Sequence, residues 1–336
     1  IINAFPTTCF DRARRSIEKN KKYKLTKRRP LKGLPIPIKD SHCVKDVRTT
    51  FGSLAFSDFV PTYSDLTVCA IENSGGIIFA KSNTPEFEAG ASTFNDVFGI
   101  TRNPWNTTRS TAGSSGGAAA SVATGMAFIA QGSDFACSVR YPAAFCGVVG
   151  LRPTPGLIPQ GPSRLPYQNL SVIGPLARNI MDIGLALDGM VGFNVEDPLT
   201  APKARFGYRR AAMLPLKPRK IGFSMNLGGL AIVSSEVEKI VKNRIAALET
   251  FGVHVYHGCP DVSNTEETFR TLRAAQFAGM WSHVLHESKD LLKPEVVWNI
   301  EKGLNLSALE IAQAEFKRNK IRNNILHFLE KNDFFV

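Results

Sequence analysis

Two clusters of serine and glycine lie close together in the sequence and contain residue types that nucleophilic catalysis needs. The first cluster is residues 113–117 and the second is residues 132–138. Residues 118–130 between them are small and mostly apolar, so they can bury one face, which a flexible linker would not do. A serine hydroxyl in such a cluster can act as a nucleophile once a base removes its proton.

Lys39 is the candidate base for such a serine. It follows residues 33–38, a run of apolar and proline residues that favours burial of the amine. Burial disfavours the charged form and therefore lowers the pKa of a lysine. A lysine that acts as a base near pH 7 needs its pKa lowered by roughly three units from about 10.4, which costs about 4 kcal/mol.

These residues resemble the amidase signature family, hydrolases with a triad of serine, cis-serine and lysine. Lys39, Ser114 and Ser138 match the triad in order and spacing, with 75 residues (114 − 39) and 24 residues (138 − 114) between them. Further segments match the family at residues 101–106, 140–143 and 147–154. The resemblance covers most of the chain, and its three separated triad positions make it specific.

The resemblance implies a reaction and a role for each triad residue. Neutral Lys39 would deprotonate Ser114, which would take the proton from Ser138 as Ser138 attacks an amide carbonyl. An acyl-Ser138 intermediate would follow. The resemblance also implies a cis peptide bond between Gly113 and Ser114, and a supporting hydrogen-bond role for Ser115.

We expect a strand over residues 127–131 that leads into a loop of residues 132–138. This loop before Ser138 would stabilise the oxyanion of the tetrahedral intermediate. Backbone N–H groups are the usual donors for this charge. The resemblance implies that they come from four consecutive residues, namely Phe135, Ala136, Cys137 and Ser138. Asp134 and Arg140 match a buried ion pair of the family and would support this loop.

The loop departs from the family at two positions, because Ala136 and Cys137 stand where two glycines usually precede the nucleophile. A Cβ atom at either position costs energy if the backbone there needs a positive φ. We expect both residues to have an ordinary negative φ, so that the loop accepts them.

Most of the positive charge lies in one short segment. The chain has a formal net charge of +12, and residues 12–32 hold eleven basic residues and one acidic residue. They therefore carry +10 (11 − 1), which leaves +2 for the rest. We expect a basic surface arm, with a helix from Phe10 to about Lys19. Solvation explains it best, and an anionic membrane or partner is the alternative. We expect no nucleic-acid partner, since no nucleic-acid-binding motif accompanies it.

The composition is that of a soluble globular enzyme. The chain has 336 residues, of which 43% are hydrophobic and 21% charged, and it has no apolar run long enough to span a membrane. We expect an α/β fold, a single α/β/α domain over residues 1–336 whose mixed central sheet is covered by helices on both faces. We expect this domain to be incomplete at both termini, because the resemblance starts late and stops early.

The six cysteines are scattered and show no CxxC spacing. A disulfide framework or a zinc site is therefore not expected, and the thiols should be reduced in a cytoplasmic protein. His283 and His286 lack a matching third ligand. We expect no metal and no cofactor. We expect the substrate to be a small-molecule amide, and a homodimer is compatible with the sequence.

Three functions fit these observations. The favoured one is a metal-free serine amidase acting on a small or medium carboxamide. The second is the amidase subunit of a glutamine-dependent tRNA amidotransferase, with a partner protein and tRNA. It is less favoured because the basic charge lies on one arm only, and because Glu88, Gly90 and the run to Asn95 resemble general amidases. The third is a noncatalytic amidase-fold protein that has lost turnover through the change at Ala136 and Cys137 or through truncation. The sequence does not specify which amide is cleaved.

Overall fold

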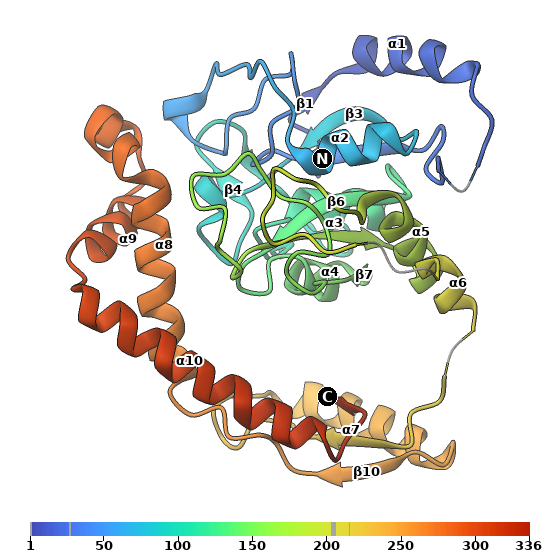
Figure 1. Ribbon diagram of the computed structural model, residues 1–336, viewed down its shortest axis with the longest axis vertical. Coiled ribbons are helices and arrows are strands. Elements are labelled where there is room, and N and C mark those ends of the chain that lie inside the picture. The colour runs from blue at the N-terminus through green and yellow to red at the C-terminus, as the bar shows by residue number, and fades with distance from the viewer. Residues whose placement is uncertain (1, 27, 203–205, 215) are drawn as a thin grey trace. The chain divides into compact units, whose positions relative to one another are not determined.

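The computed structural model describes residues 2–26, 28–202, 206–214 and 216–336 (Figure 1). Lys27 of the predicted basic arm lies outside the described residues. The chain divides into two compact units. The larger consists of Ile1–Leu214 and Gly279–Ile300, and the smaller of Pro215–Ala278 and Glu301–Val336.

The larger unit alternates short strands with helices. In chain order its elements are β1 (Thr7–Thr8), α1 (Phe10–Lys21), β2 (Pro35–Lys39), α2 (Leu66–Asn73), β3 (Ile77–Ser82), β4 (Phe94–Asn95), β5 (Gly99–Ile100), α3 (Gly116–Ala123), β6 (Ile129–Asp134), α4 (Arg140–Cys146), β7 (Val149–Gly150), β8 (Val172–Ala177), α5 (Ile180–Met190) and α6 (Tyr208–Met213). Two helices contribute residues to both units, α8 (Thr265–Ser288) and α9 (Pro294–Leu304).

The strands of the larger unit form a mixed arrangement. In one sheet, with the order β1–β3–β2, β2 runs parallel to β3 and β1 runs antiparallel to it. In a second sheet, with the order β6–β8–β7, neighbouring strands are antiparallel. A side chain links the two sheets, because the Lys39 N–H on β2 donates to Gln131 Oε1 on β6 at 2.9 Å. The predicted α/β class with mixed strands is confirmed.

Helices cover both faces of β6. Successive side chains of a strand point to opposite faces. Ile129 belongs to an apolar cluster that includes Leu187 of α5, whereas the next residue, Ala130, belongs to a second cluster that includes Val122 of α3. The strand that leads toward the candidate nucleophile is therefore held between two packed layers.

Strand β6 begins two residues later and ends three residues later than the predicted strand over residues 127–131. We expected residues 132–138 to form a loop, but β6 continues through Asp134. The prediction was wrong for residues 132–134 because Ser133 and Asp134 pair with Ile173 and Val172 of β8. Only residues 135–139 remain as a connection before α4, so the polar side chains of Ser133 and Asp134 project from a paired strand.

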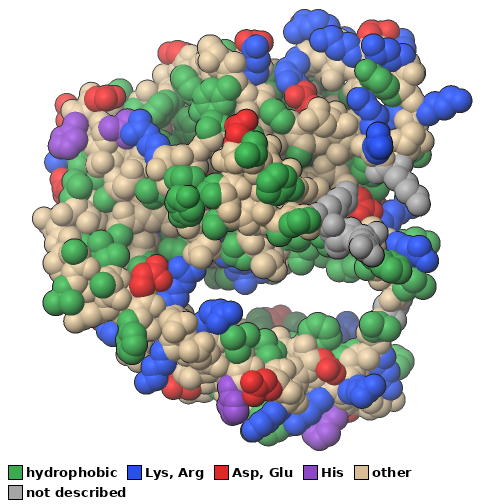
Figure 2. Space-filling view, viewed as in Figure 1, with side chains coloured by type: hydrophobic (Ala, Val, Ile, Leu, Met, Phe, Trp, Pro, Cys, Tyr) green, Lys and Arg blue, Asp and Glu red, His purple; other side chains and the backbone are tan. Residues whose placement is uncertain are grey.

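The basic arm begins with α1, whose first residue is the predicted Phe10. The helix packs through buried Ala13 and through a stacked contact between Phe10 and Phe79. Arg12 pairs with Glu72 of α2 at 2.7 Å. Lys and Arg side chains gather over α1 and the segment after it (Figure 2). The exposed basic residues of the arm are Arg14, Arg15, Lys19, Lys21, Lys22, Lys24 and Arg28.

The smaller unit is a parallel sheet packed against helices. Its elements are β9 (Lys220–Phe223), α7 (Ser235–Thr250), β10 (His254–His257), α10 (Ala308–Leu329) and β11 (Phe334–Phe335). Strand β9 lies between β10 and β11 and is parallel to both. Its core contains Ile221, Ile245 and Val255. No helix in the described ranges is long and apolar enough to cross a membrane.

Gly117 in α3 offers a direct test of the packing around the first serine cluster. A Cβ atom at Gly117 would lie 2.3 Å from the backbone N of Asn83 and 2.8 Å from the carbonyl oxygen of Ala4. Backbone atoms cannot rotate away, so we expect Gly117→Ala to lower the free energy of unfolding by about 1–3 kcal/mol. Gly192→Ala is the control, because a Cβ there has no atom within 4 Å. Equal midpoints for the two variants in chemical denaturation would contradict the described packing.

Candidate active site

Lys39 lies at the end of β2, and its side chain is fully buried. Its Nζ lies 2.6 Å from Ser114 Oγ and 2.9 Å from Ser133 Oγ. Ser114 comes from the segment before α3, 75 residues away in the chain. The structure therefore brings the candidate base into direct contact with the serine that it is predicted to deprotonate.

The environment of Lys39 favours the neutral amine. Burial lowers the pKa of Lys39 below its ordinary value, while the nearby carboxylates of Glu88 and Asp134 oppose this shift. The pKa of Lys39 is lowered overall, because the loss of hydration destabilises the ammonium more than the two carboxylates stabilise it. A lysine with this shift fits the role of a proton acceptor.

The first serine cluster turns sharply into α3. The peptide bond between Gly113 and Ser114 is cis, as the resemblance implies. The Ser115 hydroxyl donates to the carbonyl oxygen of Ser133 at 3.2 Å. The Ser115 N–H donates to the carbonyl oxygen of Ser138 at 3.0 Å. Backbone and side chain of Ser115 thus tie the two clusters together.

Ser138 lies beside this cluster and is 7% exposed. Within the described part of the chain, its hydroxyl makes no hydrogen bond to Ser114, so the proton relay between these two serines stays a prediction. The structure joins Lys39 to Ser114 directly, and it positions Ser138 through the backbone bond from Ser115.

The loop of residues 135–138 differs from our expectation at Cys137. The φ of Cys137 is +68°, in the left-handed region, so the prediction of a negative φ was wrong for this residue. The Asp134 carboxylate accounts for it, because Asp134 Oδ1 accepts the Cys137 N–H at 2.9 Å. Ala136 has no positive φ, as expected. In this conformation the Cys137 N–H donates to Asp134, which argues against Cys137 as an oxyanion donor, and the roles of Phe135, Ala136 and Ser138 stay predictions.

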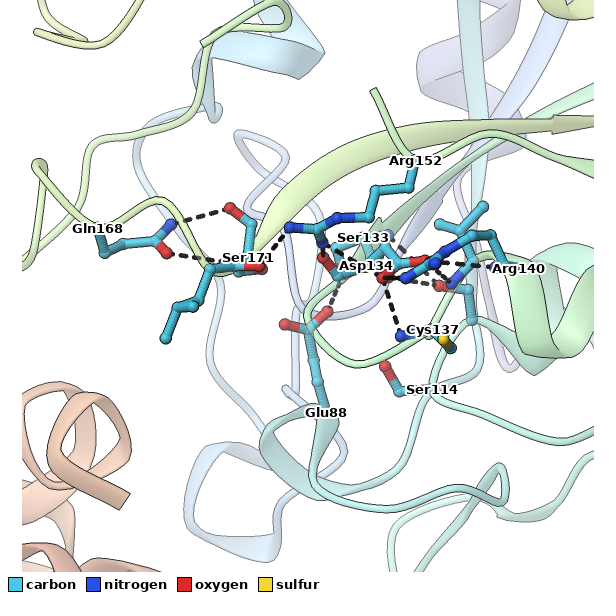
Figure 3. Close-up of polar contacts among 12 residues, drawn as sticks. Glu88, Ser114, Ser133, Asp134, Cys137, Arg140, Arg152, Gln168 and Ser171 are labelled. Carbon is cyan, nitrogen blue, oxygen red and sulfur yellow. Dashed lines mark hydrogen bonds and ion pairs between the residues drawn. The ribbon is translucent and has the colours of Figure 1, made fainter. Parts of the chain in front are cut away.

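Asp134 is the centre of a charged network (Figure 3). Its side chain is fully buried, and both carboxylate oxygens lie 3.0 Å from the Arg140 guanidinium. Arg152 Nη1 lies 3.3 Å from Asp134 Oδ1. Arg140 is 47% exposed, so only the acidic half of the predicted ion pair is buried. Burial raises the pKa of Asp134, but the hydrogen bonds and charges of the arginines outweigh it and hold the pKa below its usual value.

Four polar residues at the site were not assigned a role from the sequence. Ser133 lies within the second serine cluster, and Arg152 lies within the matched segment 147–154, so position in a motif could have suggested both. Glu88 begins the segment 88–95, which resembles general amidases, whereas Ser41 has no such signal. Their hydrogen bond at 2.8 Å joins residues 47 positions apart.

This geometry supports acyl transfer through serine. A buried amine with a lowered pKa contacts one serine hydroxyl, and a second serine follows a short loop with backbone N–H groups. A base, a nucleophile and oxyanion donors are the parts that such chemistry needs. Among the described residues, no group of three His, Cys, Asp or Glu is arranged to hold a metal ion. Metal independence stays a prediction.

The α/β fold and the contact between a buried lysine and a serine cluster can now be compared with known proteins. The amidase family model matches residues 1–336, and the chain belongs to this family. It is 37% identical over 274 residues to an acylamidase of Rhodococcus erythropolis, covering 82% of this chain and 55% of that protein. It is 40% identical over 223 residues to a subunit of the glutamyl-tRNA(Gln) amidotransferase of Moorella thermoacetica, covering 66% and 46%. The chain thus spans about half the length of these curated relatives.

Solved structures support the same fold. The structure of 6-aminohexanoate cyclic dimer hydrolase complexed with substrate matches with a TM-score of 0.89 and 25% identity, over 98% of this chain and 70% of that chain. A bacterial aryl acylamidase of the amidase signature family matches with a TM-score of 0.87 over 97% of this chain and 71% of that chain. The identity there is 22%, so this second likeness concerns the fold alone.

The left-handed backbone at Cys137 predicts that two neighbouring glycine substitutions differ in their effect on the free energy of unfolding. A Cβ atom in the left-handed region costs about 1–2 kcal/mol. Cys137→Gly removes that cost, so we expect it to leave the free energy of unfolding unchanged or to raise it by up to about 1 kcal/mol. Ala136→Gly should lower it by about 0.5–1 kcal/mol, because it only adds freedom to the unfolded chain. Urea denaturation measures both, and a larger loss for Cys137→Gly than for Ala136→Gly would refute this account.

Removing the Asp134 charge should destabilise the protein. Asp134→Asn leaves two arginines without their counter-charge, and we expect a loss of about 3 kcal/mol, at the low end for a broken buried pair because Arg140 is half exposed. The folded pKa of Asp134 is lowered, so its contribution is complete above about pH 4 and is lost as the pH falls further. The difference in unfolding free energy between the wild type and Asp134→Asn should therefore become smaller below about pH 4. The exposed Asp58→Asn is the control, and a difference independent of pH would contradict the prediction.

Proposed function

We propose that this chain is a serine amidohydrolase that cleaves a carbon–nitrogen bond of a carboxamide, with Lys39 as the base, Ser114 as the proton shuttle and Ser138 as the nucleophile. The observation that carries this proposal is the 2.6 Å contact between the buried Lys39 Nζ and Ser114 Oγ. A lysine amine in water would be protonated near pH 7 and could not accept the serine proton.

The proposed reaction has two halves. In the first, Ser138 Oγ bonds to the substrate carbonyl carbon, its proton passes to Ser114, and the proton of Ser114 passes to Lys39. The carbon–nitrogen bond then breaks, and the proton returns along the same path to the leaving amine. In the second half, water attacks acyl-Ser138, the ester bond breaks, and a carboxylic acid leaves as Ser138 regains its proton.

The negative oxygen of each tetrahedral intermediate needs donors that are already in place. We assign this role to the backbone N–H groups of Phe135, Ala136 and Ser138. One such donor contributes about 3–4 kcal/mol to transition-state stabilisation. Asp134 supports the loop by accepting the N–H groups of Cys137 and Val139 at 2.9 and 3.2 Å.

The similar proteins support amide substrates and give a second candidate. The name of one relative is acylamidase, which favours a small or medium carboxamide for this chain. The 40% identity to a component of a tRNA amidotransferase favours a second candidate, an amidase subunit that works with a partner protein and tRNA. The two are distinguished by purification under mild conditions, since only a subunit should bring a stoichiometric partner with it.

A fluorophosphonate probe tests the proposed nucleophile and base together. We expect peptide mapping to locate the adduct on Ser138 and to find no adduct in Ser138→Ala. In Lys39→Met the labelling rate should fall by about 10²- to 10⁴-fold, as expected for loss of a positioned base. Turnover of a panel of carboxamides should fall in parallel, and added chelator should leave the wild type unchanged.

Ser57→Ala is the matched control, since Ser57 lies outside both serine clusters and should label like the wild type. Equal labelling of wild type and Lys39→Met would require another base. A wild type that neither labels nor turns over any amide would favour the noncatalytic alternative.

A further inference from the structure

Glu88 has no role in the proposed reaction, yet it touches the candidate base. Its Oε1 lies 2.7 Å from Lys39 Nζ and accepts hydrogen bonds from the hydroxyls of Ser41, at 2.8 Å, and Ser133. Figure 3 shows its carboxylate directed at Ser133, beside Ser114. The Glu88 side chain is 26% exposed, whereas that of Lys39 is fully buried. A carboxylate in contact with an amine changes how readily the amine holds a proton.

The polar contacts of Lys39 define the direction of its lone pair. The Ser133 hydroxyl donates its proton to Glu88, so its oxygen is free to accept an N–H from Lys39 at 2.9 Å. A neutral amine has two N–H groups and one lone pair. When Ser133 and Glu88 accept the two N–H groups, the lone pair is directed at the third neighbour, Ser114, at 2.6 Å.

The same contacts suit the product of proton transfer. An ammonium has three N–H donors. They match the three oxygens around Lys39 Nζ, which belong to Ser114, Ser133 and Glu88. The negative charge of Glu88 stabilises the ammonium and therefore makes Lys39 a stronger base.

The other charged groups near this pair have partners of their own. They are Asp134 of β6 with Arg140 and Arg152, Asp40 at the end of β2 with Lys81 of β3, and His42 with Asp65. Within the described ranges, Glu88 is the only carboxylate that forms an ion pair with Lys39. It is therefore the group that can control the charge of the amine most directly.

Glu88 keeps its charge over the working range of an enzyme. Burial raises the pKa of Glu88, but the charges of Lys39 and His42 and the hydrogen bonds of Lys39 and Ser133 outweigh it and lower the pKa to about 2. Conversely, burial lowers the pKa of Lys39, and Glu88 opposes that shift. At neutral pH Glu88 is therefore deprotonated, and Lys39 is the member of the pair that can carry a dissociable proton.

The backbone holds Glu88 in an uncommon conformation. Phe87 and Glu88 have φ values of +45° and +62°. Non-glycine residues rarely adopt such angles, and they persist where the surrounding structure fixes them. Phe87 is buried and stacks on Trp281 with ring centroids 4.1 Å apart. The packed ring anchors this turn, which presents the Glu88 carboxylate to Lys39.

We propose that Glu88 is a positioning residue that directs the Lys39 amine toward Ser114 and sets the pH at which this amine loses its proton. The inference rests on the proposed function for the catalytic role of Lys39. It assigns to Glu88 the control of that role, which the triad alone does not contain.

NMR titration of Lys39 tests the inference without relying on turnover. Lysine is labelled with ¹³C at Cε, and the Lys39 signal is identified by its absence in Lys39→Met. We expect the titration midpoint of Lys39 in Glu88→Gln to lie about 1–3 pH units below that of the wild type, as for the loss of an adjacent opposite charge. Glu72→Gln is the matched control, because Glu72 pairs with Arg12 rather than with Lys39. The Lys39 midpoint in this variant should equal that of the wild type.

The pH dependence of kcat/KM supplies a second readout. The acid limb should move to lower pH in Glu88→Gln by the same amount as the NMR midpoint. Glu88→Gln keeps an oxygen that can accept from Lys39, whereas Glu88→Ala removes it. The alanine variant should therefore show the same shift and a larger loss of the plateau rate. If Glu88→Gln does not fold, as judged by circular dichroism, Glu88→Ala serves for the midpoint.

The outcomes separate the inference from the proposed function. If a folded Glu88→Gln or Glu88→Ala variant has a Lys39 titration midpoint equal to or above that of the wild type, the role of Glu88 is overturned. This holds even if the variant is an active enzyme. A lowered midpoint in a protein without amide turnover would support the effect of Glu88 on Lys39 and overturn the amidohydrolase proposal.

Discussion

The site depends on one buried contact, between the amine of Lys39 and the hydroxyl of Ser114. An amine at the end of a buried strand loses its hydration, which favours the neutral form that can accept a proton. That position requires β2 to pair with β3 and to lie beside β6, whose Gln131 accepts the Lys39 N–H. The sheets of the larger unit therefore determine both the location and the proton affinity of the base.

A second constraint acts on the other side of the site, where Asp134 organises the residues that follow it. Its carboxylate accepts the N–H groups of Cys137, Val139 and Arg140 and is balanced by the Arg140 and Arg152 guanidinium groups. This bonding turns the loop sharply enough to hold Cys137 at φ +68°. Ser138 is thus positioned by a charge network as well as by its bond to Ser115.

Much of the site could be predicted from the sequence, because its parts lie in recognisable motifs. Lys39 contacts Ser114 and the bond before Ser114 is cis, as the resemblance to the amidase signature family implies. The end of β6 was misplaced because its pairing with β8 depends on residues 172 and 173, far along the chain. Polar residues such as Ser133 look like loop residues until that partner strand is known.

Two other features could not be predicted, for different physical reasons. The conformation of Cys137 depends on how many N–H groups one carboxylate accepts, and a sequence does not show this. Glu88 contacts a lysine 49 residues away (88 − 39), through a turn whose shape depends on the packing of Phe87 against Trp281. Such contacts arise from tertiary structure, and no local pattern indicates them.

The central claim is that an amide substrate acylates Ser138. Rapid acid quenching during turnover of a carboxamide, followed by peptide mass spectrometry, tests it most directly. The account predicts the acyl group of the substrate on the peptide that contains Ser138, at a level that rises within the first turnover and disappears as substrate is exhausted. An acyl group on a residue other than Ser138 would contradict this claim. A Ser138→Ala variant that still turns over the carboxamide would contradict it as well.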